Sequence, residues 1–152
     1  MKPAAFTREL LLSAAPLGPP LAHRIRFQDV DAAGLLFYPR ILEHFHDAYV
    51  ELMRSLGEPI ERALAERSWA APLQWCEGQF LRPMRFSDPV ETAVVAARLE
   101  GGELSLGFRT SHVGGAAAAV GQTRAVFVDL ATFKRSDPPA RLVELFGRLG
   151  GA

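Results

Sequence analysis

The stretch FQDVDAAGLLFYPRILEHFHDAY, residues 27–49, decides how this chain folds, because its hydrophobic pattern changes period part-way along. From Ala22 to Asp29, apolar residues alternate with polar ones, which predicts a half-buried strand. Two acids, Asp29 and Asp31, come at the end of that strand, and the small residues 32–34 then predict a turn. Beyond Pro39 the apolar residues recur every three or four positions, which predicts an amphipathic helix.

The predicted helix runs from Pro39 to Leu56. Proline suits the first turn because its missing N–H has no partner there, and Gly57 suits a helix end. The apolar stripe consists of Leu42, Phe45, Tyr49, Leu52, Met53 and Leu56. We expect His44, with the charged residues Arg40, Asp47 and Glu51, to lie on the opposite, solvated face.

The rest of the chain has mainly β character. Strands are predicted over residues 72–81, 90–99, 104–112 and 117–129, and short helices over residues 58–67 and 140–149. The glycine pairs 101–102 and 114–115 predict tight hairpins and therefore antiparallel neighbours. We expect an α+β fold in which five strands cover the long helix.

Length and composition limit the possible classes of protein. The 152 residues fit one domain, which we place at residues 21–152, after an N-terminal extension, residues 1–20, that is flexible or packed at an edge. Seventeen basic residues balance seventeen acidic ones, so charge provides no argument for a nucleic-acid or membrane partner. No run of about 18 apolar residues predicts a membrane span. The single cysteine, Cys76, excludes an intrachain disulfide and fits a reducing cytoplasm.

Asp31 is the main candidate for chemistry. An aspartate before a small-residue turn can simply stabilise that turn through its side chain. It can also act as a nucleophile or as a general base toward water, if a donor nearby stabilises the developing oxyanion. The start of the following helix offers such donors, at the Tyr38 amide or at the amides after Pro39. We interpret Asp29 as a residue that ties the loop together.

The segment from Phe27 to Pro39 resembles the signature of the 4-hydroxybenzoyl-CoA thioesterase family, whose members have the hotdog fold. The shared features are an aromatic and a polar residue, D-x-D, two small residues, a glycine, and an apolar run with an aromatic pair. The segment RPMRFSDPV, residues 82–90, is similar to the link between two strands of that family. The looser resemblance extends over about residues 22 to 135.

This resemblance implies a function and a set of site residues. Asp31 matches the catalytic carboxylate, and the Tyr38 backbone N–H, across Gly34 from it, matches the group that polarises the thioester carbonyl. The implied substrate is an acyl-CoA, with coenzyme A as part of the substrate, and neither a cofactor nor a metal is implied. The family also implies a homodimer or homotetramer with active sites at subunit interfaces.

Within the family, the chain looks most like the 1,4-dihydroxy-2-naphthoyl-CoA hydrolases of quinone biosynthesis. The pair Tyr38-Pro39 is shared with the branch that acts on aromatic acyl groups, whereas the short-chain branch carries Tyr-His there. His46 and Tyr49 are candidates for contact with the substrate ring, and Arg82 and Arg85 are candidates for contact with the nucleotide phosphates.

Several alternatives remain open from the sequence alone. The acyl group could be 4-hydroxybenzoyl or another group, and Asp31 could act covalently or as a base. A non-catalytic module that binds acyl-CoA would use the same cleft. A dehydratase would need a histidine and an acid in that cleft, for which only His46 is a candidate.

Overall fold

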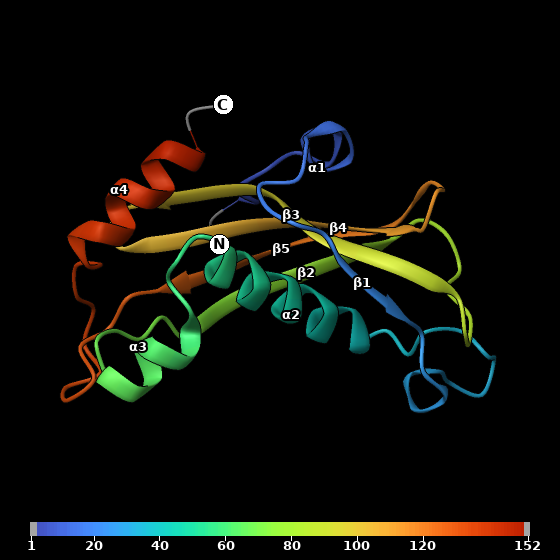
Figure 1. Ribbon diagram of the computed structural model, residues 1–152, viewed down its shortest axis with the longest axis horizontal. Helices are drawn as coiled ribbons and strands as arrows, with labels where there is room; N and C mark the ends of the chain where they lie inside the picture. The colour runs from blue at the N-terminus through green and yellow to red at the C-terminus, as the bar shows by residue number, and fades with distance from the viewer. Residues whose placement is uncertain (1–2, 151–152) are drawn as a thin grey trace.

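The computed structural model describes residues 3–150, which form one antiparallel sheet with helices on both of its faces (Figure 1). The helices are α1 (Arg8–Ser13), α2 (Arg40–Ser55), α3 (Ile60–Glu66) and α4 (Ala140–Leu149), with a 3-10 turn at Phe27–Asp29. The strands are β1 (Leu21–Arg24), β2 (Leu73–Phe80), β3 (Pro89–Glu100), β4 (Glu103–His112) and β5 (Ala117–Val126). No helix within residues 3–150 is both long and apolar enough to span a membrane.

The sheet has the strand order β1-β3-β4-β5-β2, and every neighbouring pair is antiparallel. The glycine pairs lie at the two predicted hairpins, where Glu100 pairs with Glu103 and Ser111 with Ala117. The predicted α+β class and the five strands are therefore confirmed. Strands β1 and β2 are the two edge strands of the sheet, so β2 has no neighbour on its outer side within residues 3–150.

One predicted element is wrong in its second half. The strand expected over residues 22–29 ends at Arg24, and residues 27–29 form a 3-10 turn instead. The cause is local: the Asp29 carboxylate accepts hydrogen bonds from the Arg26 backbone N–H at 3.2 Å and from its guanidinium at 2.8 and 2.9 Å. These bonds close the turn and stop the chain from continuing along the sheet.

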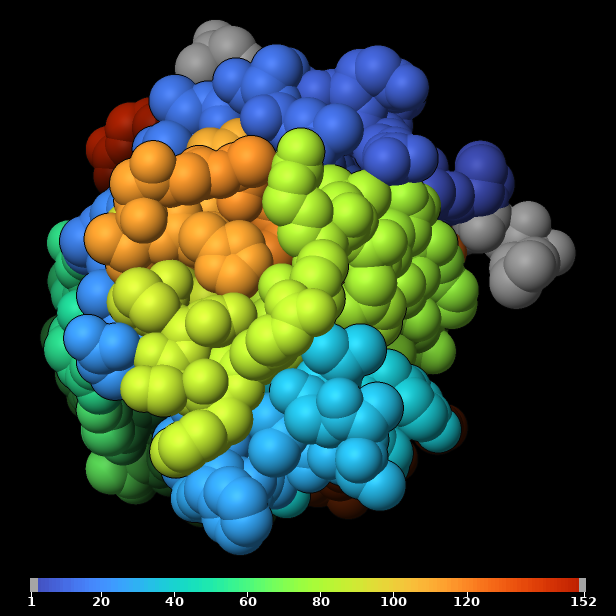
Figure 2. Space-filling view, turned by 90° about the vertical axis from the view of Figure 1, so that its right-hand side faces the viewer, coloured from blue at the N-terminus to red at the C-terminus, as the bar shows by residue number. Residues whose placement is uncertain are grey.

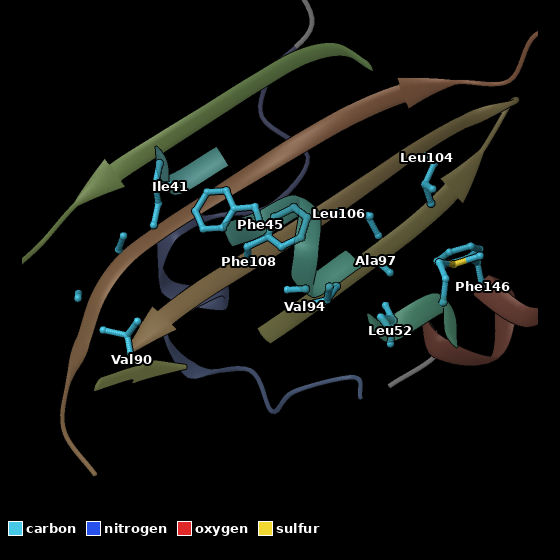
Figure 3. Packing of buried hydrophobic residues seen from close by; sticks show 14 of the residues in the cluster. Ile41, Phe45, Leu52, Val90, Val94, Ala97, Leu104, Leu106, Phe108 and Phe146 are labelled. Carbon is cyan, nitrogen blue, oxygen red and sulfur yellow. The ribbon is translucent and has the colours of Figure 1, made fainter. Parts of the chain in front are cut away.

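The core lies between α2 and one face of the sheet (Figure 3). The rings of Phe45 on α2 and Phe108 on β4 stack with centroids 4.8 Å apart, and both are fully buried. Gly121 on β5 makes room for Phe45, since a Cβ there would lie 2.3 Å from its ring. Helix α4 adds Leu142 and Phe146 to this core.

The N-terminal residues cover the opposite face of the sheet. Leu11 of α1 is 2% exposed and packs among residues of β3 and β5, in a second apolar cluster. Arg109 donates hydrogen bonds to the carbonyls of Leu11, Leu12 and Ala14 at 2.9–3.2 Å. The expectation of a flexible or edge-packed extension is therefore wrong for this part of it, because buried leucine and arginine contacts hold it on a face.

Candidate active site

Asp31 sits in a tight loop between the 3-10 turn and α2. Its Oδ1 accepts hydrogen bonds from the amides of Ala33 at 2.8 Å and Leu35 at 3.2 Å. Gly34 closes the loop with a φ of 75°, in the left-handed region that favours glycine. No group within residues 3–150 hydrogen-bonds Oδ2, and the residue is exposed. One oxygen therefore holds the turn and the other is available, so the two interpretations of Asp31 are compatible.

The start of α2 leaves one amide available. The amides of Arg40, Ile41 and Leu42 donate to the carbonyls of residues 37–39, as a helix start requires. Pro39 has no N–H, and no acceptor within residues 3–150 takes the Tyr38 amide. Of the donors that the sequence left open, the structure thus selects Tyr38. The positive end of the helix dipole adds to its attraction for an anion.

Asp31 and Tyr38 line the same open cavity, of about 410 Å³. It lies at the end of the molecule shown in Figure 2, where the blue-to-cyan segment of residues 26–38 meets the yellow-green segment that follows β2. The other lining residues are Leu35, Leu36, Phe80, Leu81, Arg82, Pro83 and Met84. The pattern of the sequence did not predict the wall formed by residues 80–84; the only signal was the family-like segment that begins at Arg82.

The two arginine candidates have different positions. Arg82 lines the cavity and donates a hydrogen bond to the Ala117 carbonyl at 2.7 Å. Arg85 is exposed and does not line the cavity, although its backbone pairs with Leu35 of the loop. Arg82 therefore has the better position for a ligand in this cavity, while contact between Arg85 and the substrate stays a prediction.

Asp29 has the structural role expected of it. It is 1% exposed, and its carboxylate pairs with Arg26 and lies 3.8 Å from the Arg40 guanidinium. The hydrogen bond from the Arg26 side chain lowers the pKa of Asp29. The Asp29 carbonyl also accepts the Phe37 amide at 2.8 Å, so this residue ties the loop to the start of α2.

His46 and Tyr49 are not in the cavity of Asp31. They line a second cavity of about 200 Å³ between α2 and the sheet, together with Leu73 and Cys76 of β2. The ring centroids of His46 and Tyr49 are 6.1 Å apart, and burial raises the pKa of the Tyr49 hydroxyl. Within one chain, the structure thus divides the predicted site residues between two cavities beside opposite halves of β2.

His44 is not on a solvated face, and that expectation is wrong. It is 7% exposed, and its Nδ1 lies 2.9 Å from Nε2 of His23 on β1. The sequence analysis missed this pair. A signal was present, since His44 falls three residues after buried Ile41 and four before buried Ala48.

The structure was also searched for side chains that could bind a metal ion. Over residues 3–150, no group of three or more histidine, cysteine, aspartate or glutamate side chains is placed to hold a metal ion.

The chain also matches a known family. Residues 25–146 match the model of the thioesterase-like superfamily. The chain belongs to this superfamily. This match confirms the superfamily and the hotdog arrangement of the sheet around α2, while membership of the narrower 4-hydroxybenzoyl-CoA thioesterase family stays a prediction.

Two hydrolases resemble this chain over most of its length. A 1,4-dihydroxy-2-naphthoyl-CoA hydrolase from Synechococcus elongatus (strain ATCC 33912 / PCC 7942 / FACHB-805) is 30% identical over 119 residues, 78% of this chain and 87% of the relative. The enzyme of the same name from Thermosynechococcus vestitus is 24% identical, over 70% of this chain and 73% of its own length.

Solved structures agree in fold. A 1,4-dihydroxy-2-naphthoyl-CoA thioesterase from Synechocystis superposes with a TM-score of 0.77 at 18% identity, covering 88% of this chain and 98% of the other. A Staphylococcus aureus protein solved in complex with CoA has a TM-score of 0.78 at 9% identity, covering 90% and 85%.

Proposed function

We propose that this protein hydrolyses an aromatic acyl-CoA thioester, with Asp31 as the reacting carboxylate and the Tyr38 amide as the oxyanion donor. One observation carries the proposal: Asp31, with one carboxylate oxygen unpaired, and Tyr38, with its amide unpaired, line one cavity within residues 3–150. A thioester in that cavity would place its carbonyl oxygen toward the Tyr38 N–H. A donor so placed contributes on the order of 3 kcal/mol to the transition state.

The reaction can proceed through Asp31 in two ways. As a base, Asp31 takes a proton from water, the hydroxide oxygen bonds to the acyl carbon, and the C–S bond breaks. The proton then passes from Asp31 to the leaving thiolate, which releases CoA as the thiol. As a nucleophile, a carboxylate oxygen bonds to the acyl carbon and displaces the CoA thiolate, and water then hydrolyses the resulting anhydride. In single turnover in ¹⁸O-water, ¹⁸O in Asp31 identifies the covalent route with water attack at the Asp31 carboxyl carbon. Rapid-quench mass spectrometry of the acylated enzyme identifies the covalent route whichever carbon of the anhydride the water attacks.

The favoured substrate is 1,4-dihydroxy-2-naphthoyl-CoA. Support comes from the names of the relatives, which cover most of this chain, and from Tyr38-Pro39 at the site. Apolar side chains such as Leu35, Phe80 and Met84 around Asp31 suit a fused ring. Hydrolysis measured against a panel of aromatic and straight-chain acyl-CoAs tests this choice, which would be wrong if a straight-chain thioester had the highest kcat/KM.

The decisive variant for the activity is Asp31→Asn. It keeps an oxygen to accept the amides of Ala33 and Leu35 but removes the base and nucleophile. We expect thiol release to fall by on the order of 10²-fold or more, with the fold intact by circular dichroism. Thiol release at the wild-type rate would rule out this mechanism, and tight binding without turnover by the wild-type protein would indicate an acyl-CoA binding module.

We also propose that the active unit is a homodimer joined through β2. Within residues 3–150 this strand has an unpaired outer edge, with exposed Leu73 and Phe80 at its two ends. Antiparallel pairing of β2 with a second copy would bring Leu73, beside the cavity of His46, next to the partner's Phe80, beside the cavity of Asp31. Light scattering after gel filtration tests this, since a monomeric mass would exclude it.

Two further points are proposals. The reaction is expected to need no metal or cofactor, which full activity after dialysis against EDTA would support and lost activity would contradict. A cytoplasmic location fits the single free Cys76, and fractionation of cells that produce the protein tests it.

A further inference from the structure

The pair of histidines between β1 and α2 is a feature that the proposed reaction does not use. His23 Nε2 and His44 Nδ1 are 2.9 Å apart, and the two rings meet edge to face with centroids at 4.1 Å. His23 Nδ1 in turn lies 3.2 Å from the Leu21 carbonyl. The contact joins residues 21 positions apart, on two different elements.

The partners determine which nitrogens carry protons. A carbonyl only accepts, so His23 must carry its proton on Nδ1 to donate to Leu21. Neutral His23 then has Nε2 free to accept, and His44 must donate from Nδ1. A first proton on Nε2 of His23 keeps the contact, because neutral His44 can change tautomer and accept at Nδ1. The contact is lost when both rings are protonated, since Nε2–H of His23 then faces Nδ1–H of His44.

The two histidines flank the segment that contains the candidate catalytic groups. His23 precedes the segment, His44 follows it, and residues 24–43 between them include Asp31 and Tyr38. Inside the segment, the Asp29 carbonyl accepts the Phe37 amide, directly before Tyr38. A bond between β1 and α2 therefore fixes the spacing of the two elements from which the site residues extend.

We propose that His23 and His44 form a clasp, a neutral hydrogen-bonded pair that positions Asp31 and the Tyr38 amide and opens when both rings are protonated. Its role in catalysis rests on the proposed thioester hydrolysis; its existence as a titrating link between β1 and α2 does not. The two histidines are positioning residues and do not line the cavity of Asp31.

The charges around the clasp do not keep it protonated at neutral pH. Burial lowers the pKa of His44 to about 4, with His23 adding to the effect. Burial also lowers the pKa of His23. The acids Asp29, Glu43 and Asp47 oppose this and Arg26 supports it, but burial dominates.

The direction of the pH dependence follows from these shifts. Because folding lowers both pKa values, the native state binds fewer protons than the unfolded chain below the ordinary value of 6.5. The stabilisation is complete above 6.5 and is lost as the pH falls toward about 4, where His44 takes up its proton. The clasp is expected to hold at neutral pH and to open in acid.

A non-titrating copy of the clasp provides the test. In the double variant His23→Gln with His44→Asn, the glutamine oxygen replaces the accepting Nε2 and the asparagine NH₂ replaces the donating Nδ1–H. At neutral pH we expect this variant to keep most of the wild-type kcat. On the acid side, its half-maximal activity should move to lower pH. The single variant His44→Leu keeps the volume and breaks the bond, and should lower kcat by about 10- to 100-fold with KM little changed.

Three measurements distinguish the possible outcomes. The control is His112→Gln, at a half-buried histidine at the end of β4, where the glutamine NH₂ can keep the bond to the Pro83 carbonyl. This variant should keep the wild-type acid midpoint. Imidazole ¹⁵N NMR of the wild-type protein should show Nδ1–H on both His23 and His44, and it requires no activity. A proton on Nε2 of His23, or an unchanged acid midpoint in the double variant, would overturn the proposal. If the wild type hydrolyses no thioester, the proposed function fails, while NMR and the pH dependence of unfolding still test the clasp.

Discussion

Two aspartates two positions apart, Asp29 and Asp31, have different roles, and the difference follows from how deeply each carboxylate is buried. Asp29 is 1% exposed and held by Arg26, whereas Asp31 is exposed and one of its oxygens has no partner within residues 3–150. A buried carboxylate needs its charge partner, so Asp29 serves the structure. A carboxylate fixed through one oxygen and open at the other is suited to react with a ligand.

Asp29→Asn should therefore destabilise the protein at pH 7, by about 1–3 kcal/mol, because it weakens buried charge-assisted bonds. The native pKa of Asp29 is lowered, so its contribution is present above the unfolded pKa of about 3.9 and is lost as the pH falls through the native value. Urea unfolding should show the difference from wild type shrinking in acid. Asp31→Asn is the matched control, and a larger loss of stability there would reverse the two assignments.

At the scale of elements, the packing of α2 on the sheet depends on close approach. Phe45 lies on Gly121 of β5, where a Cβ would also meet the Glu77 carbonyl oxygen at 2.4 Å. A backbone atom cannot swing aside as a flexible side chain can. The helix that provides the Tyr38 amide is therefore held at a distance set by the missing side chain of a glycine.

Gly121→Ala is expected to destabilise the fold by about 1–3 kcal/mol through overpacking. Gly147→Ala in α4 provides the comparison, since a Cβ there meets nothing within 4 Å. In a helix interior that change should be neutral or stabilising, by up to about 1 kcal/mol. Thermal melts of both variants measure the contrast, and equal effects would show that close approach does not limit this core.

At the scale of the whole molecule, one chain does not bring all the candidate residues together. The cavity of Asp31 and the cavity of His46 and Tyr49 lie beside opposite ends of β2. A two-fold axis through the middle of an antiparallel pair of β2 strands would exchange those ends. The proposed dimer thus accounts for the division of the site.

Complementation tests this arrangement. We expect Asp31→Asn and the double variant His46→Ala/Tyr49→Phe to be impaired as separate homodimers. A heterodimer of the two, purified through two different tags, has one doubly defective composite site and one intact site, so it should recover about half of the wild-type activity. Activity no higher than the average of the two impaired homodimers would show that each chain works alone.

Much of this protein could be predicted from the order of its residues. The change from a period of two to a period of 3.6, the glycine pairs and Pro39 predicted α2, the hairpins and the five-stranded sheet correctly, because such patterns reflect local backbone preferences. The D-x-D-x-x-G segment indicated Asp31 and the 4-hydroxybenzoyl-CoA thioesterase family by resemblance, and the match bears out the wider thioesterase-like superfamily.

Other features required the tertiary structure, because they depend on which distant residues meet. Contacts between separate elements determine three such features. They are the end of β1 at Arg24, the burial of His44 against His23, and the packing of α1 on the face of the sheet opposite α2. The same is true of the Tyr38 amide, which has no acceptor within residues 3–150, and of the division of the site between two cavities. Local patterns determine the period of each element, whereas register and side-chain contacts determine what each element faces.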